Sequence, residues 1–238
     1  MKMDLSQAEE YFQKYYDKLI WETILARARL KLNEHLDNYR SSYLRELNQA
    51  PHFFKLTMVA HYDDALLTLS RILDRHEDSL SIWKFFNFVE QNRRIFSNQA
   101  FRQRMKENPN YASLIKSHTP ITLKEVDEDR QKLGSLEDTI SRIRELRDKV
   151  LAHTDRTFYL SGKITTKKYT FKRKKLYEVI APLIEILNRY SGAYNASSYS
   201  ARFLGEDDVQ YVMDFIRSHI QERKKQLEAL KKQARDKG

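Results

Sequence analysis

Apolar residues recur every three or four positions along several long segments of this sequence, as one face of an α-helix requires. One series runs from Leu25 to Tyr43, and another runs from Met58 to Ile72. The 238 residues include only 5 glycines and 4 prolines, too few for the many tight turns of a fold built from short strands. We therefore predict an all-α fold, an antiparallel bundle of about five or six helices that forms a single domain over residues 1–238.

Local signals predict where the first helices begin. Helices are expected to start near Gln7, after Pro51 and after a capping Ser79. Thr122 and Glu125 have the spacing of a capping box, so a fourth helix is expected to start there and to continue through residue 150. The stretch before it, residues 97–120, contains two prolines and is expected to hold only short helical pieces.

The last part of the sequence contains two more helical patterns, over about residues 176–194 and from residue 205 onward. Pro182 lies inside the first and should kink it, because proline lacks a backbone donor. Before these helices, residues 156–171 alternate apolar and polar side chains around a serine and a glycine, which predicts a short hairpin or an extended arm. The C-terminal tail, about residues 222–238, is expected to be a solvated or fraying helix.

Composition limits the classes of function. The sequence has no cysteine, which excludes disulfides and thiolate metal sites. It shows neither the apolar stretch of a signal peptide nor an uncharged run of membrane-spanning length, so we expect a cytoplasmic protein that does not contact membranes. It also lacks metal-ligand spacing and a phosphate-binding glycine loop, so we expect no cofactor. The net charge of +10 favours a polyanionic partner such as RNA, because Lys and Arg side chains release counterions from phosphates.

One arginine occupies a position that the helical pattern assigns to an apolar residue. Arg147 follows Ile143 by four residues in the apolar series that begins at Leu133, and Val150 continues that series. Other arginines also precede histidines in this chain, but they fall in a predicted loop or beside the apolar series. A guanidinium keeps its charge, so on a buried face it needs a carboxylate or a phosphate. Arg147 and the nearby His153 are therefore the candidate functional pair.

Two interpretations of this pair stay open from the residues alone. In the structural one, Arg147 pairs with an internal acid and His153 caps helix carbonyls. In the functional one, Arg147 holds a phosphodiester and His153, whose ordinary pKa is about 6.5, moves a proton. At ~100° per residue the two side chains point about 120° apart on an ideal helix. A bent helix end, or a two-fold axis that faces one copy toward another, is needed to bring them together.

The segment RDKVLAH, residues 147–153, resembles the signature of the HEPN superfamily, in which an arginine and a polar residue precede a short run that ends in histidine. Asp148 supplies the polar position. The segments DDALLTLSRILDR (63–75) and ILNRYS (186–191) extend the similarity. In order and spacing, from about residue 20 to 220, the sequence is similar to the AbiU-type, abortive-infection branch of these proteins.

This resemblance implies a metal-independent RNA endonuclease that acts in antiphage abortive infection or as a toxin. The RNA 2′-OH would attack the adjacent phosphate and leave a 2′,3′-cyclic phosphate and a 5′-OH. Arg147 would stabilise the phosphorane charge, His153 would act as general acid or base, and Asp148 would orient the motif. The resemblance also implies a homodimer whose two motifs meet at a cleft, and it raises an antitoxin protein as a further partner.

One position departs from the pattern of some HEPN toxins. Those toxins carry a tyrosine two residues past the histidine, and a partner nucleotidyltransferase modifies it. Here Asp155 stands at that position, which argues against regulation by that route.

A basic stretch after the motif interleaves lysines with Tyr169 and Phe171, as a surface that binds single-stranded RNA would, with bases stacked on the rings and phosphates on the lysines. The candidate RNA-binding residues are Lys167, Lys168, Tyr169, Lys172, Arg173 and Lys174. The alternative for this stretch is a solvated arm. Upstream, Arg71 and Asp74 either contact the motif or form a local ion pair, which we favour. The competing function for the whole chain is a non-catalytic helical module that binds RNA or a protein.

Overall fold

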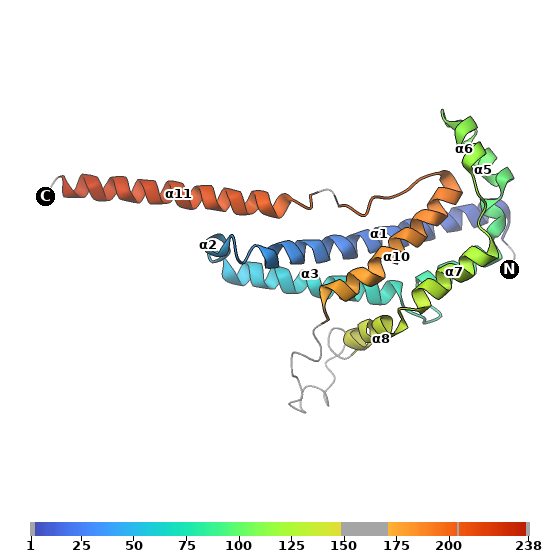
Figure 1. Cartoon of the computed structure of the whole chain (residues 1–238), viewed down its shortest axis with the longest axis horizontal. Coiled ribbons are helices and arrows are strands. Elements are labelled where there is room, and N and C mark those ends of the chain that lie inside the picture. The colour runs from blue at the N-terminus through green and yellow to red at the C-terminus, as the bar shows by residue number, and fades with distance from the viewer. Residues whose placement is uncertain (1–2, 149–170, 204, 237–238) are drawn as a thin grey trace, which may run out of the picture. The chain divides into compact units, whose positions relative to one another are not determined.

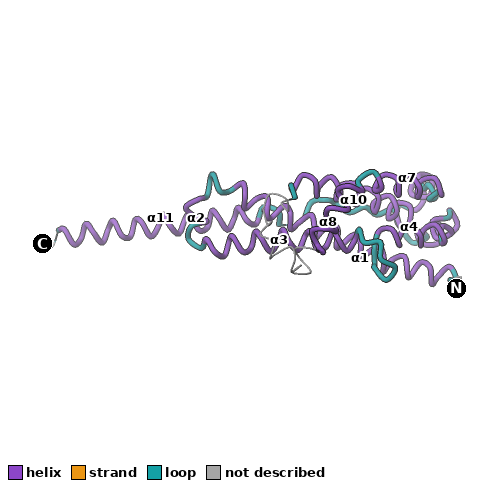
Figure 2. The backbone as a smooth tube through the Cα atoms, turned by 90° about the horizontal axis from the view of Figure 1, so that it is seen from below, coloured by secondary structure: helices purple, strands orange, loops and turns teal. Residues whose placement is uncertain are grey.

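The computed structural model describes residues 3–148, 171–203 and 205–236, and every regular element within them is a helix (Figures 1 and 2). The all-α prediction is therefore confirmed. The elements, in chain order, are α1 (Leu5–Asn38), α2 (Leu44–Leu47), α3 (Pro51–Ile72), α4 (Ile82–Gln91), the 3-10 turn η1 (Arg93–Phe96), α5 (Asn98–Met105), α6 (Tyr111–Ser117), α7 (Leu123–Gly134), α8 (Glu137–Leu146), α10 (Arg173–Asn195) and α11 (Asp208–Arg235). The described residues thus form more helices than the five or six expected, because short elements such as α2, α5 and α6 stand beside the long helices α1, α3, α10 and α11.

The chain divides into two compact units. The first joins Met1–Arg27 to Asp64–Ala201, and the second joins Ala28–Asp63 to Arg202–Gly238. Helices α1 and α3 each contribute one segment to each unit. The single domain expected from the sequence stays a prediction.

Aromatic side chains form much of the core of the first unit. Phe12 of α1 lies edge-on to Phe96, with ring centroids 5.2 Å apart, and Phe85 of α4 lies edge-on to Tyr190 of α10, also at 5.2 Å. All four side chains are fully buried. Edge-to-face pairs stabilise a core by about 0.5–1.5 kcal/mol beyond the area that they bury. Helix α10, which contains Pro182 without interruption, packs against α5, α7 and α8 and so connects the pieces of this unit.

The capping box is confirmed at the start of α7. The Glu125 carboxylate accepts a hydrogen bond from the Thr122 N–H at 2.8 Å, and the Thr122 hydroxyl accepts one from the Glu125 N–H at 3.2 Å. The expected continuation of this helix to residue 150 is wrong, because α7 ends at Gly134 and α8 begins at Glu137. The Ser135 N–H still donates to the Gln131 carbonyl, but the next N–H, that of Leu136, donates three residues back to Leu133. This tighter turn breaks the helix directly after Gly134, and glycine has a low helix propensity.

The predicted cap of α4 is also wrong. Helix α4 begins at Ile82, so Ser81 and not Ser79 precedes its first turn. The Ser79 hydroxyl donates instead to the His76 carbonyl at 2.7 Å. The Ser81 backbone exchanges two 3.0 Å hydrogen bonds with the Tyr15 hydroxyl, which ties this helix start to α1. The short helices expected between residues 97 and 120 are confirmed as α5 and α6.

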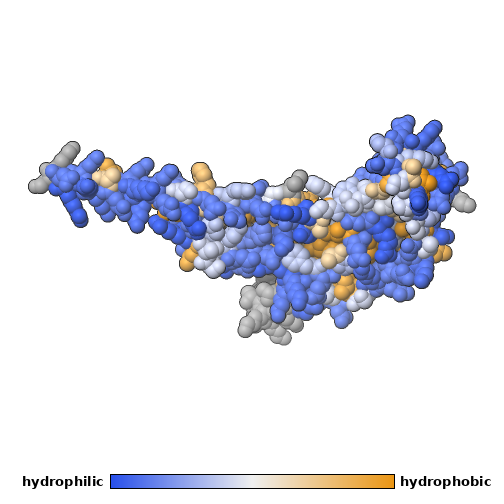
Figure 3. All heavy atoms as spheres, turned by 45° about the horizontal axis from the view of Figure 1, so that its top comes forward, coloured by the Kyte–Doolittle hydropathy of each residue, from blue (hydrophilic) through white to orange (hydrophobic). Residues whose placement is uncertain are grey.

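The second unit has its own apolar core, to which the first half of α11 contributes Val209 and Met213. The other buried members are Leu36, Tyr43, Leu47 and Phe54. Arg217 of α11 donates to Glu46 at 2.8 Å and lies over the Tyr43 ring, 4.0 Å from its centroid. Every residue from 221 to 236 is exposed, and Figure 3 shows this part of α11 covered mainly by hydrophilic side chains.

Candidate functional site

Arg147 lies directly after α8, in a wider helical turn that it shares with Asp148. Helix α8 buries Ile140, Ile143 and Leu146 in the first unit, and this packing fixes the direction in which the arginine leaves the helix. The Arg147 side chain is 24% exposed. The apolar position that the sequence assigns to this arginine is therefore a partly buried one.

Two carboxylates bind the Arg147 guanidinium. Its Nη1 donates to Asp74 Oδ2 at 2.9 Å, and its Nε donates to Asp148 Oδ1 at 2.7 Å. Asp74 is 23% exposed and Asp148 is 56% exposed. Asp74 follows the end of α3, where its Oδ1 also accepts a hydrogen bond from the His76 N–H at 3.0 Å. The internal acid that the structural interpretation requires is thus present.

The hydrogen bonds set the charge states in this cluster. Burial raises the pKa of Asp74, but the His76 N–H and the Arg147 guanidinium outweigh burial and hold this pKa below its usual value. The hydrogen bond to Asp148 raises the pKa of Arg147, and burial opposes it only in part. Arg147 therefore stays a cation between two carboxylates. Among the described residues no hydrogen bond uses its Nη2, so these donors can reach an anion without breaking either pair.

Asp74 contacts the motif instead of forming the local pair with Arg71 that we favoured. Arg71 is exposed, and its Nη2 lies 3.3 Å from Glu22 and 3.2 Å from the Thr68 hydroxyl. The segment 63–75, which carries part of the family resemblance, thus contains the partner of the motif arginine at its second-last position. This contact joins residues 73 positions apart in the sequence.

The other similar segment, residues 186–191, has a structural role. Its Arg189 lies on α10 and donates to the buried Asp129 of α7 at 2.7 Å, which connects the two helices. Burial raises the pKa of Asp129 despite this partner. Tyr190, the next residue, is fully buried in the aromatic core.

Several of the predicted site residues lie outside the described part of the chain: His153, Lys167, Lys168 and Tyr169, together with the predicted hairpin or arm. Lys172, Arg173 and Lys174 are described at the start of α10, where both lysines are exposed and the arginine is partly buried. Phe171, the second aromatic residue of the basic stretch, is 8% exposed, so its ring is not available to stack on a base.

Sequence reasoning missed Glu137, the first residue of α8. Its carboxylate accepts hydrogen bonds from Arg144 and, at 2.9 Å, from Arg75. Glu137 therefore connects Arg75, the residue after Asp74, to α8, the helix that Arg147 directly follows. No local signal marks this role, because the Arg75 contact spans 62 positions in the sequence.

The described residues contain no group of three or more His, Cys, Asp or Glu side chains arranged to hold a metal ion. No helix among them combines the length and the apolar character needed to cross a membrane.

The model of the AbiU2 family of HEPN proteins matches residues 9–215 of the chain. No curated protein and no solved structure matches the chain. The matched range includes Asp74 and Asp148 as well as the RDKVLAH segment.

Proposed function

Since the chain belongs to the AbiU2 family of HEPN proteins, we propose that it is a metal-independent RNA endonuclease that acts in antiphage abortive infection or as a toxin. The observation that carries the proposal is Arg147, a motif arginine in a partly buried position whose guanidinium is held by two carboxylates. Such a group is oriented before a phosphate arrives, so little reorganisation accompanies the reaction.

The proposed reaction needs only groups of the chain and of the RNA. The 2′-oxygen attacks the neighbouring phosphorus, the bond to the 5′-oxygen breaks, and the products carry a 2′,3′-cyclic phosphate and a 5′-OH. His153 takes the 2′-OH proton or supplies a proton to the leaving 5′-oxygen. Arg147 stabilises the charge on the phosphorane oxygens, and Asp148 orients the guanidinium.

A second function is favoured by the same contacts. The two aspartates carry more negative charge than the single arginine neutralises, so they oppose the approach of a phosphate. A non-catalytic helical module that binds RNA or a protein would use Arg147 to connect the end of α3 to α8. Its RNA contacts would then come from the basic residues at the start of α10 and the stretch before it: Lys167, Lys168, Tyr169, Lys172, Arg173 and Lys174.

The products of incubation with RNA separate these functions. Purified protein is incubated with single-stranded RNA in EDTA, and the new ends are analysed for a cyclic phosphate. The His153→Ala variant serves as the matched control against a contaminating nuclease. Cyclic ends with the wild type alone support the endonuclease. Cleavage that requires added Mg²⁺ argues against the mechanism, and binding without cleavage favours the module.

We also propose that the active form is a homodimer in which two motifs face each other. Asp74 and Asp148 supply the counter-charge of Arg147 within one chain, so this arginine does not itself require a partner subunit. The proposal depends on the family resemblance and on the divergence of about 120° between Arg147 and His153 on an ideal helix. A strict monomer in light scattering at micromolar concentration would refute it, and co-purification with the product of an adjacent gene would test for an antitoxin.

A further inference from the structure

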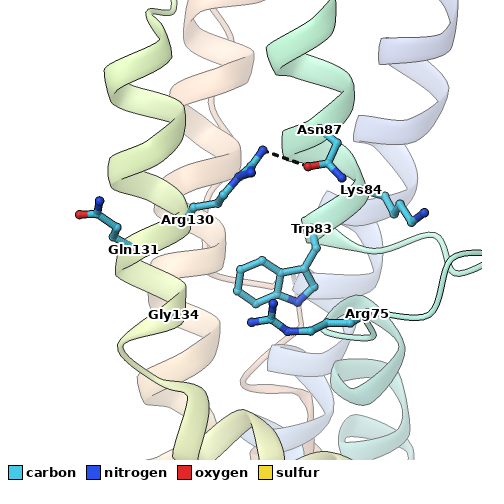
Figure 4. A pocket seen from close by; sticks show the side chains of 7 residues that line it. All are labelled: Arg75, Trp83, Lys84, Asn87, Arg130, Gln131 and Gly134. Atoms are coloured by element: carbon cyan, nitrogen blue, oxygen red, sulfur yellow. Dashed lines mark hydrogen bonds between the residues drawn. The ribbon is translucent and has the colours of Figure 1, made fainter.

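A basic pocket with an aromatic side chain opens between α4 and α7 in the first unit (Figure 4). Its volume is about 490 Å³, within the range of about 300–1,000 Å³ that small-molecule sites occupy. The lining residues that matter here are Arg75, Trp83, Lys84, Asn87, Arg130 and Gly134. None of the residues that line it is acidic, so the pocket suits an anionic ligand.

The aromatic side chain is fixed in place. The Trp83 Nε1–H donates to the Leu73 carbonyl at 3.0 Å, and the ring packs edge-on against Phe86. The Arg75 guanidinium lies over the indole, 4.1 Å from the ring centroid. Figure 4 shows the indole extending from α4 toward α7 with Arg75 against it. Because Arg75 covers one face of the ring, a nucleobase would stack on the opposite face of this partly buried indole.

Arg130 of the pocket keeps hydrogen-bond donors that its neighbours do not use. Arg130 is oriented by Glu90 at 2.8 Å and by the Asn87 side-chain oxygen at 3.0 Å, and both of these hydrogen bonds use Nη2. A guanidinium has five N–H donors, and no hydrogen bond among the described residues uses Nη1 of Arg130. A phosphate in the pocket would accept hydrogen bonds from Nη1. The ring and the cations together match the two parts of a nucleotide.

Ion pairs join this pocket to the motif. Asp74 and Arg75 are consecutive residues, and Asp74 binds Arg147 while Arg75 binds Glu137 at the start of α8. Arg75 of the pocket therefore contacts the first residue of α8, and Arg147 directly follows the last residue of this helix. We propose that the pocket holds a nucleotide of the same RNA strand as the bond cleaved at Arg147, with its base against Trp83 and its phosphate on Arg130. Glu137 and Arg147 lie about 15 Å apart along α8, so this nucleotide would not be the one directly beside the cleaved bond. This proposal rests on the proposed endonuclease function.

Trp83 fluorescence reports directly on stacking. The chain has two tryptophans, and the other, Trp21, is 55% exposed on α1 and does not line the pocket. The Trp21→Phe variant therefore leaves Trp83 as the single indole. A 2′-O-methyl RNA oligomer of mixed sequence is the probe, because it lacks the attacking hydroxyl and stays intact. We expect saturable quenching of Trp83 by this oligomer and much weaker binding of uridine 5′-monophosphate.

Two variants test the charge and the space of the pocket. Arg130→Gln should weaken oligomer binding roughly tenfold and reduce the salt dependence of affinity by about one ion. Gly134→Leu should weaken binding to a similar extent by filling the cavity. A β-carbon at Gly134 meets no atom within 4 Å, so a side chain can start there without a clash, and a thermal melt checks that the variant stays folded. Lys124→Gln is the control, since Lys124 is 86% exposed on α7 and the substitution changes the charge equally.

The outcomes separate the pocket from the proposed function. Suppose that the wild type binds and cleaves RNA. The pocket assignment would then be overturned if the oligomer left Trp83 fluorescence unchanged and if Arg130→Gln and Gly134→Leu bound the oligomer as tightly as Lys124→Gln does. A wild type that neither binds nor cleaves RNA would remove the endonuclease proposal and the pocket proposal together. Mononucleotide binding as tight as oligomer binding would assign the pocket to a free nucleotide and overturn the assignment to RNA.

Discussion

Replacing Arg147 by alanine should destabilise the protein through the loss of its pair with Asp74. Removing one partner of a fully buried pair costs about 3–5 kcal/mol, whereas exposed pairs contribute about 0.2–1 kcal/mol. The Arg147 and Asp74 side chains are 24% and 23% exposed, which lies between these limits and nearer the buried one. We expect a loss of about 2–3 kcal/mol in the free energy of unfolding. For a chain of this length that corresponds to a fall in Tm of roughly 4–12 °C.

A double-mutant cycle assigns this loss to the pair. Thermal melts of Arg147→Ala, Asp74→Asn and the double variant should give a coupling energy of about 1–2 kcal/mol, because each single change removes the same interaction. Asp148→Asn is the matched control. Because Asp148 is 56% exposed, Asp148→Asn should lower the free energy of unfolding by less than about 1 kcal/mol. A melt of Arg147→Ala within about 1 °C of the wild type, or a coupling energy near zero, would refute the reasoning.

Three further predictions concern proton transfer, acid stability and helix capping. His153→Ala should lower the RNA cleavage rate by roughly 10²–10⁴ with unchanged RNA affinity; wild-type cleavage by this variant would end the catalytic assignment. The pKa of Asp74 is lowered from 3.8 in the folded protein, so its carboxylate stabilises the fold above that pH. The stability difference between wild type and Asp74→Asn should be constant above about pH 5 and shrink as the pH falls below 3.8, as acid titrations of unfolding can measure. Thr122→Ala should lower the free energy of unfolding, measured with denaturant, by about 1 kcal/mol, and Thr122→Ser should lower it much less. Equal stability of the two variants would contradict the capping role.

The features that follow from neighbours along the chain were predictable from the sequence. Helical class and the capping box at Thr122 depend on residues within a few positions of one another, so local spacing identifies them. The break between α7 and α8 was missed because apolar spacing continues across Gly134 and Ser135 while the backbone turns. In α1 the predicted series included Leu25 and Leu32, which are only partly buried. The fully buried face passes instead through polar positions such as Asn33, whose side chain donates to the Met58 carbonyl at 2.7 Å.

The candidate site was only partly predictable for the same physical reason. The position of Arg147 in an apolar series indicated that it needs a counter-charge, which is a local inference. The identity of that counter-charge depends on how the end of α3 packs beside α8, and nothing within either segment specifies this. The pocket at Trp83 requires α4 and α7 to lie side by side, so its residues carry no shared pattern in the sequence.

The exposure of the second half of α11 has a consequence for local unfolding. Val209 and Met213 hold the first half in the core of the second unit, whereas residues 221–236 are all exposed. Helices of about 12–15 residues are marginally stable in water when tertiary packing does not support them. Amide hydrogens beyond residue 220 should therefore exchange with solvent far faster than those of Met213 to Arg217, which follow the first turn of α11. Trypsin should likewise trim this helix from its C-terminal end while the core of the unit stays folded.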